Sequence, residues 1–126
     1  MGPVDEHLDR LKRRTATASL EEVAGSGWLV RIPAVRLPAG WSKSQTSVVF
    51  HVPQGYPFAK LDSFWADLDL RLSNGSMPRN AQLTNPVPGS SDQLLWFSWH
   101  VEPWNPNRDD FVSWLSSIRQ RLAQPT

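Results

Sequence analysis

Apolar residues recur at helical spacing near the start of the chain. Val4, Leu8 and Leu11 fall on one face of a helix that we predict over residues 3–14. Pro3 suits its first position, where the backbone N–H has no partner within the helix. Acidic residues follow in the first turn and basic residues in the last, which suits the helix dipole. The pattern predicts a short amphipathic helix.

The same spacing returns at the end of the chain. Phe111, Leu115, Ile118 and Leu122 repeat at i, i+4, i+7 and i+11, so a second helix is expected to lay this face on a sheet. Two caps suit this helix. Either Asn105 caps it with Pro106 following, or Asn107 caps it with two aspartates in the first turn.

Between the helices, apolar and polar residues alternate with the period of a β-strand. The alternation and the glycine and proline turns predict an antiparallel meander of four strands at residues 15–23, 28–38, 47–52 and 68–72. The run at 47–52 (S-V-V-F-H-V) is the clearest, because it is rich in β-branched residues. The order of helix, strands and helix indicates an α+β fold, and the length suits a single domain over residues 1–126.

A long irregular loop is predicted over residues 73–92, which contain Asn74-Gly75 and three prolines. Connections of that length in a small domain are usually functional or mobile. From Gln93 the chain is expected to form a further strand that carries Ser98 and His100. It then turns at residues 104–106 (W-N-P) into the second helix.

Composition narrows the function. The chain has 13 basic and 12 acidic residues, well mixed, with a net charge of +1, so nucleic-acid binding is not expected. It has no cysteine, which rules out disulfides and thioester chemistry on this chain. No apolar run approaches the roughly 20 residues of a membrane helix, and the start lacks the apolar core of a signal peptide. We expect a soluble, cytoplasmic protein without a cofactor.

Several motifs resemble the ubiquitin-conjugating E2 superfamily. Residues 52–57 (V-P-Q-G-Y-P) look like the F-P-x-x-Y-P loop after the third strand of that fold, and residues 104–106 look like its W-S-P turn. Residues 96–100 (W-F-S-W-H) and 104–109 (W-N-P-N-R-D) are similar to a bacterial branch, prokaryotic E2 family E. The resemblance covers nearly the whole chain from Trp28 onward. It implies a UBC-like fold in which the loop at 73–92 lies at the active site.

The chain departs from a typical E2 in two respects. Trp96 stands where such an enzyme carries its cysteine, and the H-P-N signature is absent, since residues 85–88 are N-P-V-P. The standard thioester mechanism therefore cannot operate on this chain as written.

Ser98 and His100 are the remaining candidates for covalent chemistry. On a strand they share a face with Cα atoms roughly 6.5 to 7 Å apart, so the imidazole can act as general base for the hydroxyl. Asp92 is a weaker candidate for the third member of the set, because a lone aspartate at a loop end is more often a cap. Solvated side chains without catalytic roles, His100 acting without Ser98, and a residue of the 73–92 loop remain alternatives.

Other candidate sites are fewer. His100 and Glu102 supply two metal ligands at best, and a metal site needs three, so no metal site is predicted. His7 is expected on the polar side of the first helix, and the Tyr56 hydroxyl is expected to bond to the backbone. The resemblance implies that an E1 partner meets the first helix, which offers Arg10, Arg13 and Arg14, and Trp41 in a polar loop is a candidate for an exposed contact.

Two functions follow from the resemblance. The first is a transferase that accepts a ubiquitin-like protein from an E1-like adenylating enzyme and holds it as an oxyester on Ser98. The second is a non-catalytic E2-like module that binds a ubiquitin-like protein or an E1 partner through surface contacts alone.

Overall fold

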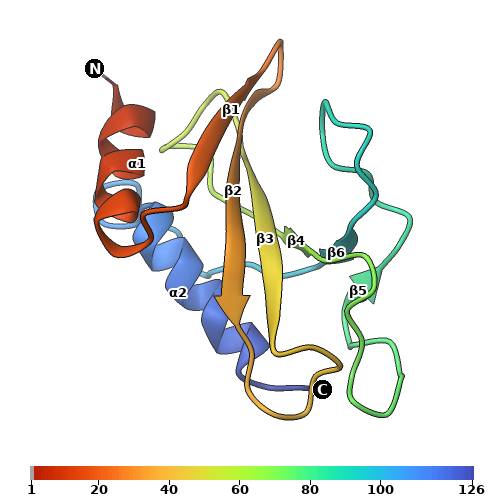
Figure 1. Cartoon of the computed structure of the whole chain (residues 1–126). Coiled ribbons are helices and arrows are strands. Elements are labelled where there is room, and N and C mark those ends of the chain that lie inside the picture. The colour runs from red at the N-terminus through yellow and green to blue at the C-terminus, as the bar shows by residue number, and fades with distance from the viewer. Residues whose placement is uncertain (1) are drawn as a thin grey trace.

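The computed structural model describes residues 2–126, which form two helices and one antiparallel sheet of six strands (Figure 1). The helices are α1 (Pro3–Arg14) and α2 (Phe111–Leu122). The strands are β1 (Ser19–Val23), β2 (Gly27–Arg36), β3 (Gln45–Val52), β4 (Phe64–Ala66), β5 (Ala81–Gln82) and β6 (Leu95–Phe97). Their order across the sheet is β1-β2-β3-β4-β6-β5. The α+β fold class and both predicted helices are confirmed.

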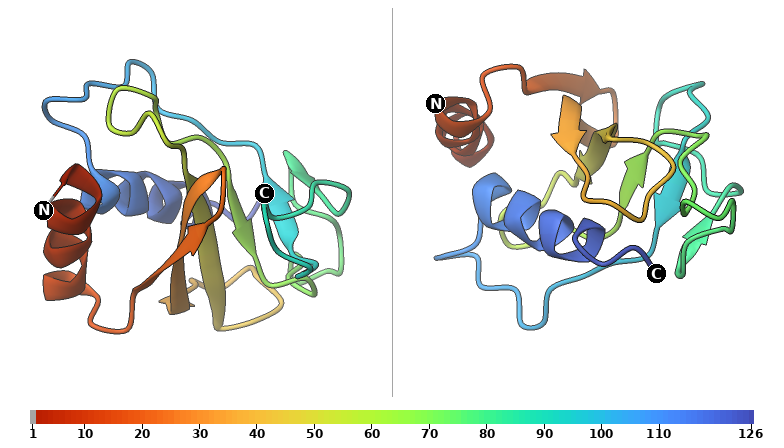
Figure 2. Two further views of the ribbon diagram at one scale, coloured as in Figure 1. Left: turned by 90° about the horizontal axis from the view of Figure 1, so that it is seen from above. Right: turned by 60° about the horizontal axis from the view of Figure 1, so that its bottom comes forward.

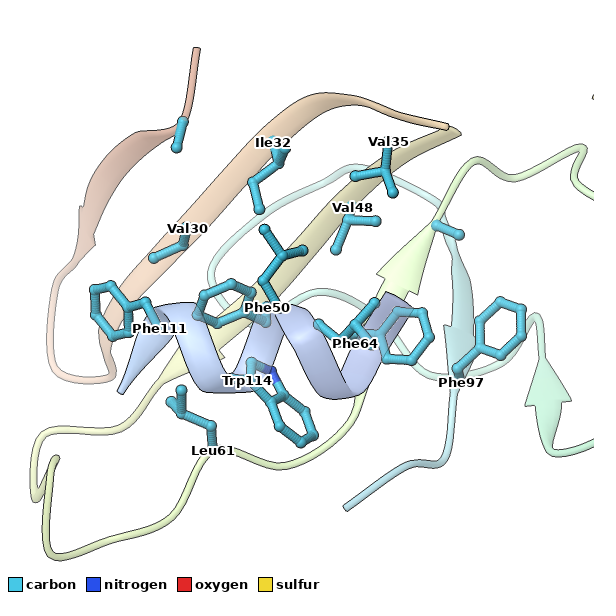
Figure 3. Packing of buried hydrophobic residues seen from close by; sticks show 14 of the residues in the cluster. Val30, Ile32, Val35, Val48, Phe50, Leu61, Phe64, Phe97, Phe111 and Trp114 are labelled. Carbon is cyan, nitrogen blue, oxygen red and sulfur yellow. The ribbon is translucent and has the colours of Figure 1, made fainter. Parts of the chain in front are cut away.

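The core lies between α2 and one face of the sheet (Figure 3). Helix α2 crosses that face, and α1 lies beside the first turns of α2 (Figure 2). Neither helix in the described residues has the length and apolar character needed to cross a bilayer. The largest fully buried side chains of this core include Phe50, Phe64, Leu61, Phe97, Phe111, Trp114 and Ile118.

The four-stranded meander was wrong in its last part. Strands β1 to β3 form as an antiparallel meander, but the fourth strand is Phe64–Ala66 and not residues 68–72. Leu70 closes a turn by donating its N–H to the Asp67 carbonyl at 3.1 Å, and Leu72 makes a single bridge with Trp41. The alternating leucines therefore follow a turn. Two further short strands, β5 and β6, complete the sheet beyond β4.

Residues 83–94, which we call the strap, cover the other face of the sheet. Val87 is 1% exposed and packs with Leu29, Val49 and Trp65 in a second apolar cluster. The Trp65 indole N–H donates to the Asn85 carbonyl at 2.9 Å. The second half of the predicted loop is therefore packed against the sheet. With α2 on one face and the strap on the other, both faces of the sheet are covered by apolar side chains.

One glycine fixes how closely the strap approaches the hairpin of β1 and β2. Gly89 has φ of +67°, and a Cβ at this position would lie 2.2 Å from Val23 Cγ1. Any larger residue would meet both a disfavoured backbone conformation and a steric overlap. Glycine at position 89 thus allows the strap to lie close against the hairpin.

Asp110 caps α2, so neither predicted cap was right. Its carboxylate accepts the Ser113 N–H at 2.9 Å, and the Ser113 hydroxyl accepts the Asp110 N–H at 2.9 Å. Asn105 lies in the preceding turn, where its N–H donates to the Asp109 carboxylate at 2.7 Å. The turn and the cap are thus consecutive, and the helix begins only at Phe111.

Replacing Asp110 with alanine is expected to lower the free energy of unfolding by about 1 kcal/mol, the usual cost of a lost N-cap. Asp110→Asn is the matched control, because asparagine keeps the capping acceptor without the charge. Urea denaturation followed by circular dichroism measures both. If the asparagine variant loses as much as the alanine variant, the charge and not the cap carries the effect.

Arg121 holds the end of the chain in place. Its side chain is buried and donates to the carbonyls of Gln124 at 2.8 Å, Arg79 at 2.9 Å and Thr126 at 3.0 Å. The guanidinium also lies 5.2 Å from the Phe97 ring centroid and 5.9 Å from that of Trp41. The carbonyls accept hydrogen bonds from the buried guanidinium, and the aromatic faces stabilise its positive charge.

Candidate functional site

Ser98 and His100 lie directly after β6, at the point where the sheet ends. The strand that was predicted to carry them ends at Phe97, so both residues belong to the segment that follows it. The alternation of side chains continues past the strand: Phe97 is buried and Trp99 half-buried, whereas Ser98 and His100 are exposed. The hydroxyl and the imidazole are therefore both open to an approaching substrate.

Two hydrogen bonds fix the backbone of this segment from opposite neighbours. Ser98 donates its N–H to the Asn80 carbonyl at 2.8 Å, and Trp99 accepts the Ser63 N–H at 2.7 Å. Asn80 and Ser63 each have φ of 61°, and within residues 2–126 they alone combine a positive φ with a side chain. Such conformations cost about 1–3 kcal/mol and gather at functional sites. The positive φ angles of Asn80 and Ser63 thus indicate a functional site at Ser98 and Trp99, and this indication does not depend on the sequence pattern.

Two indole side chains hold the ends of the segment. The Trp99 N–H donates to the Ser117 carbonyl of α2 at 3.1 Å, with the Ser117 hydroxyl also within 3.0 Å. The Trp104 N–H donates to the Pro57 carbonyl at 2.8 Å. Trp99 ties the segment to α2, and Trp104 ties it to the loop after β3. His100 therefore sits on a stretch whose two ends are fixed.

A buried histidine and tyrosine connect α1 to this loop. His7 Nδ1 and the Tyr56 hydroxyl share a hydrogen bond of 2.5 Å, and the Tyr56 ring lies against Trp104 and Phe111. Both expectations for these residues were wrong, since His7 is on the buried side of α1 and Tyr56 bonds to a side chain. Burial lowers the pKa of His7 and raises the pKa of Tyr56 far above its usual range. Neutral His7 and protonated Tyr56 are therefore the stable pair.

Stability is expected to fall as the pH drops below 6.5, the ordinary pKa of histidine. The folded protein holds His7 at a lower pKa, against the smaller opposing effect of Asp110. As the pH falls, His7 therefore binds a proton in the unfolded chain before it does so in the folded protein. The contribution of neutral His7 to the free energy of unfolding is fully present above pH 6.5 and is lost as the pH falls toward the pKa of His7 in the folded protein. Urea midpoints between pH 7 and pH 5 measure this loss.

His7→Phe is the control for the pH dependence, because phenylalanine fills the site without titrating. The variant is expected to lose the part of the slope that lies between pH 7 and pH 5. An equal slope in the variant and the parent would assign the pH dependence to other groups.

Comparison with known proteins gives the family. The model of prokaryotic E2 family E matches residues 6–125. The chain belongs to prokaryotic E2 family E. Neither the curated proteins nor the solved structures provide a match. The match confirms the resemblance drawn from residues 96–109 and supports an E2-like role in general.

In this family E chain, Asp92 lies apart from the other two candidate residues. It precedes β6, whereas Ser98 and His100 follow it. Its carboxylate pairs with Arg31 on β2 at 3.1 Å, and Arg31 also contacts Glu21. Seven residues separate Asp92 from His100, and three of them form β6. Ser98 and His100 both lie on the exposed segment after β6, whereas Asp92 pairs with Arg31 and holds the strap.

The residues expected to meet a partner divide into two groups. Arg10, Arg13 and Arg14 lie exposed on α1, where Arg10 approaches Asp110 at 3.4 Å. Trp41 was wrongly expected at the surface. It is 6% exposed, and its indole N–H donates to the Leu122 carbonyl at 2.7 Å. Its aromatic face also contacts buried Arg121, so Trp41 closes the end of α2 and is not a contact surface.

Sequence reasoning on this family E chain missed Asn80 and Ser63. Asparagine tolerates a positive φ better than most residues, which is the one local signal that Asn80 carried. Ser63 carried none. Their roles depend on pairing with Ser98 and Trp99, which follow them by many residues, and no local pattern reports that pairing. Within residues 2–126 no three histidine, aspartate or glutamate side chains converge as metal ligands.

Proposed function

We propose that this family E protein accepts a ubiquitin-like protein from an E1-like adenylating enzyme and carries it on Ser98. The observation that supports this proposal is the exposed hydroxyl of Ser98 on a backbone fixed by two strained residues, with exposed His100 two residues away. Family membership supports an E2-like role in general, and Ser98 is the nucleophile that we propose in place of the missing cysteine.

The transfer step needs three events. His100 takes the proton of the Ser98 hydroxyl, and the Ser98 oxygen attacks the C-terminal carbonyl carbon of the ubiquitin-like protein held by the E1-like enzyme as a thioester. The carbon–sulfur bond then breaks, and the leaving thiolate receives the proton from His100. A hydroxyl needs this help, because its ordinary pKa leaves it a poor nucleophile at neutral pH. The product is an oxyester on Ser98.

Fixing the backbone serves this chemistry. A general base must lie within hydrogen-bond reach of the proton it removes, directly or through one water. Asn80 and Ser63 hold the main chain on either side of the Ser98–Trp99 peptide, and Trp99 is tied to α2. The Ser98 and His100 side chains are exposed and can rotate to close on a substrate that arrives between them.

The test is the intact mass of the full chain after incubation with the E1-like enzyme, the ubiquitin-like protein and ATP. The expected product is heavier by one ubiquitin-like protein less one water. It survives dithiothreitol and is cleaved by hydroxylamine, as an oxyester requires. A reaction without ATP is the control. An unchanged mass with retained binding of either partner would establish the non-catalytic module instead.

A further inference from the structure

The segment after β6 runs antiparallel to the loop that precedes β4. In the sheet, Phe64 of β4 pairs with Phe97 of β6. One residue earlier in the loop, the Ser63 N–H donates to the Trp99 carbonyl at 2.7 Å. One step along the loop therefore corresponds to two steps after β6, and Ser98 is the extra residue. This irregularity is a β-bulge, a feature that redirects side chains and recurs beside active sites.

The pairing continues beyond the bulge in a new register. Lys60 Nζ lies 3.4 Å from Glu102 Oε1. Each of these residues is three positions beyond the hydrogen bond that joins the loop to the segment, so the two contacts follow one register. The same register places Asp62 opposite His100, one position beyond that hydrogen bond. A contact on each side therefore determines which residue of the loop faces His100.

Burial indicates that the opposed residues point to the same side. Leu61 is buried and Val101, its counterpart, is half-buried, and both pack in the main core. Asp62 and His100, the next pair, are both exposed. Directly opposed side chains of an antiparallel pair have Cβ atoms about 4.5–5.5 Å apart. The register therefore places the Asp62 carboxylate and the His100 imidazole within reach of each other at the surface.

A carboxylate opposite an imidazole has a defined use. A neutral imidazole has one protonated and one free ring nitrogen, and only the free nitrogen can take a proton. A carboxylate that accepts the N–H determines which nitrogen is free, and it stabilises the imidazolium that forms. In the described residues the two side chains are not hydrogen-bonded, as is common for catalytic contacts before a substrate binds. Because both are exposed, rotation of the side chains can bring them together.

Two further charged side chains on this face, Lys60 and Glu102, pair with each other. Glu102 is on the same segment as His100, two residues later, whereas Asp62 faces it from the opposite chain. Within residues 2–126, Asp62 takes part in no ion pair. Asp92, the candidate for this role in the sequence, is held in an ion pair elsewhere. Asp62 is therefore the carboxylate that is free to orient the imidazole.

We propose that Asp62 is the positioning residue for His100. Its carboxylate accepts the N–H of one ring nitrogen, and the other nitrogen is then free to take the proton of the Ser98 hydroxyl. The inference rests on the proposed function for its consequence, the transfer of the ubiquitin-like protein to Ser98. The orientation of the imidazole is a property of the free protein and does not require that transfer.

The first test is the tautomeric state of His100 in the free protein. Long-range ¹H–¹⁵N correlation spectra are recorded at about pH 8.5, well above the ordinary histidine pKa of about 6.5. The ring nitrogens of the parent are expected to show the widely separated shifts of a single tautomer, and those of Asp62→Ala the averaged shifts of a free imidazole. Asp9→Ala, which removes an exposed carboxylate of α1, is the control for net charge and should match the parent.

The second test is the rate of adduct formation on Ser98, followed by intact mass. Asp62→Ala is expected to lower this rate about two- to fivefold, the range that an exposed charge pair contributes. Asp62→Glu keeps a carboxylate and should recover most of the rate. Circular dichroism verifies that each variant folds.

Three results would overturn the inference. Asp62→Ala leaves the nitrogen shifts of His100 unchanged, Asp62→Ala forms the adduct as fast as a reactive parent, or Glu102→Gln alters the shifts as much as Asp62→Ala does. The spectra require no E1-like enzyme, ubiquitin-like protein or ATP. A parent that forms no adduct would therefore contradict the proposed function alone, and the tautomer of His100 would still decide the role of Asp62.

Discussion

Ser98→Ala is expected to abolish the covalent adduct with the ubiquitin-like protein, because a methyl group has no oxygen to attack the carbonyl. His100→Gln is expected to lower the rate of adduct formation by about 10²–10⁴-fold, the usual contribution of a general base. Both side chains are exposed, so neither change should alter the fold. Intact mass at a series of times measures both rates.

Two further variants make this test specific. Ser91→Ala removes another exposed hydroxyl, on the strap, and should react like the parent. It also tests whether Ser91 of the 73–92 loop supplies the nucleophile. Ser98→Cys should form an adduct that dithiothreitol cleaves, because a thioester replaces the oxyester. An adduct that persists in Ser98→Ala, or a Ser98→Cys adduct that resists dithiothreitol, would place the chemistry elsewhere.

Arg121→Met is expected to lower the free energy of unfolding by about 2–4 kcal/mol. Hydrogen bonds to a charged donor contribute about 1.5–3 kcal/mol, and buried acceptors left without a donor add to the loss. Arg121 serves three carbonyls and two aromatic faces at once. Arg119→Met, an exposed arginine two residues earlier on α2, is the matched control and should change stability by less than about 0.5 kcal/mol.

The Arg121 variant also bears on the candidate site. Arg121 binds the Arg79 carbonyl, and the next carbonyl, that of Asn80, accepts the Ser98 N–H. Loss of the guanidinium should therefore loosen the support of Ser98 and speed exchange of its amide hydrogen beyond what global unfolding explains. Equal stability losses in Arg121→Met and Arg119→Met, measured by urea denaturation, would contradict a special role for the buried residue.

Local sequence patterns predicted two kinds of element: helices whose apolar repeat extends over several turns, and strands that pair with the next strand along the chain. Helices α1 and α2 each repeat their apolar face over three turns, and β1 to β3 follow one another along the chain with connections of three and eight residues. Strands β4, β5 and β6 have three, two and three residues, too few for a period to register. They form because they pair with one another, as Phe64 and Ala81 both do with Phe97.

The residues of the candidate site also differ in how far the sequence could predict them. Ser98 and His100 could be selected from the sequence, since a hydroxyl and an imidazole two residues apart on an extended segment share a side. The surroundings of Asp92, Trp41 and His7 could not be predicted, because they depend on Arg31, Leu122 and Tyr56, each distant in sequence. A polar neighbourhood in sequence, as around Trp41, does not report burial beneath a segment from the other end of the chain.

The strap has a consequence for how this chain can vary. Residues 83–94 have the composition of a loop, yet Val87 occupies a place in the second apolar cluster and Gly89 lies against Val23. Insertions there would lift Val87 from the sheet and open an apolar face to self-association. The turn at Asn74 and Gly75, which is exposed and has open space around the glycine, can lengthen without that penalty. Length is therefore free to drift in the connection between β4 and β5 and fixed in the connection between β5 and β6.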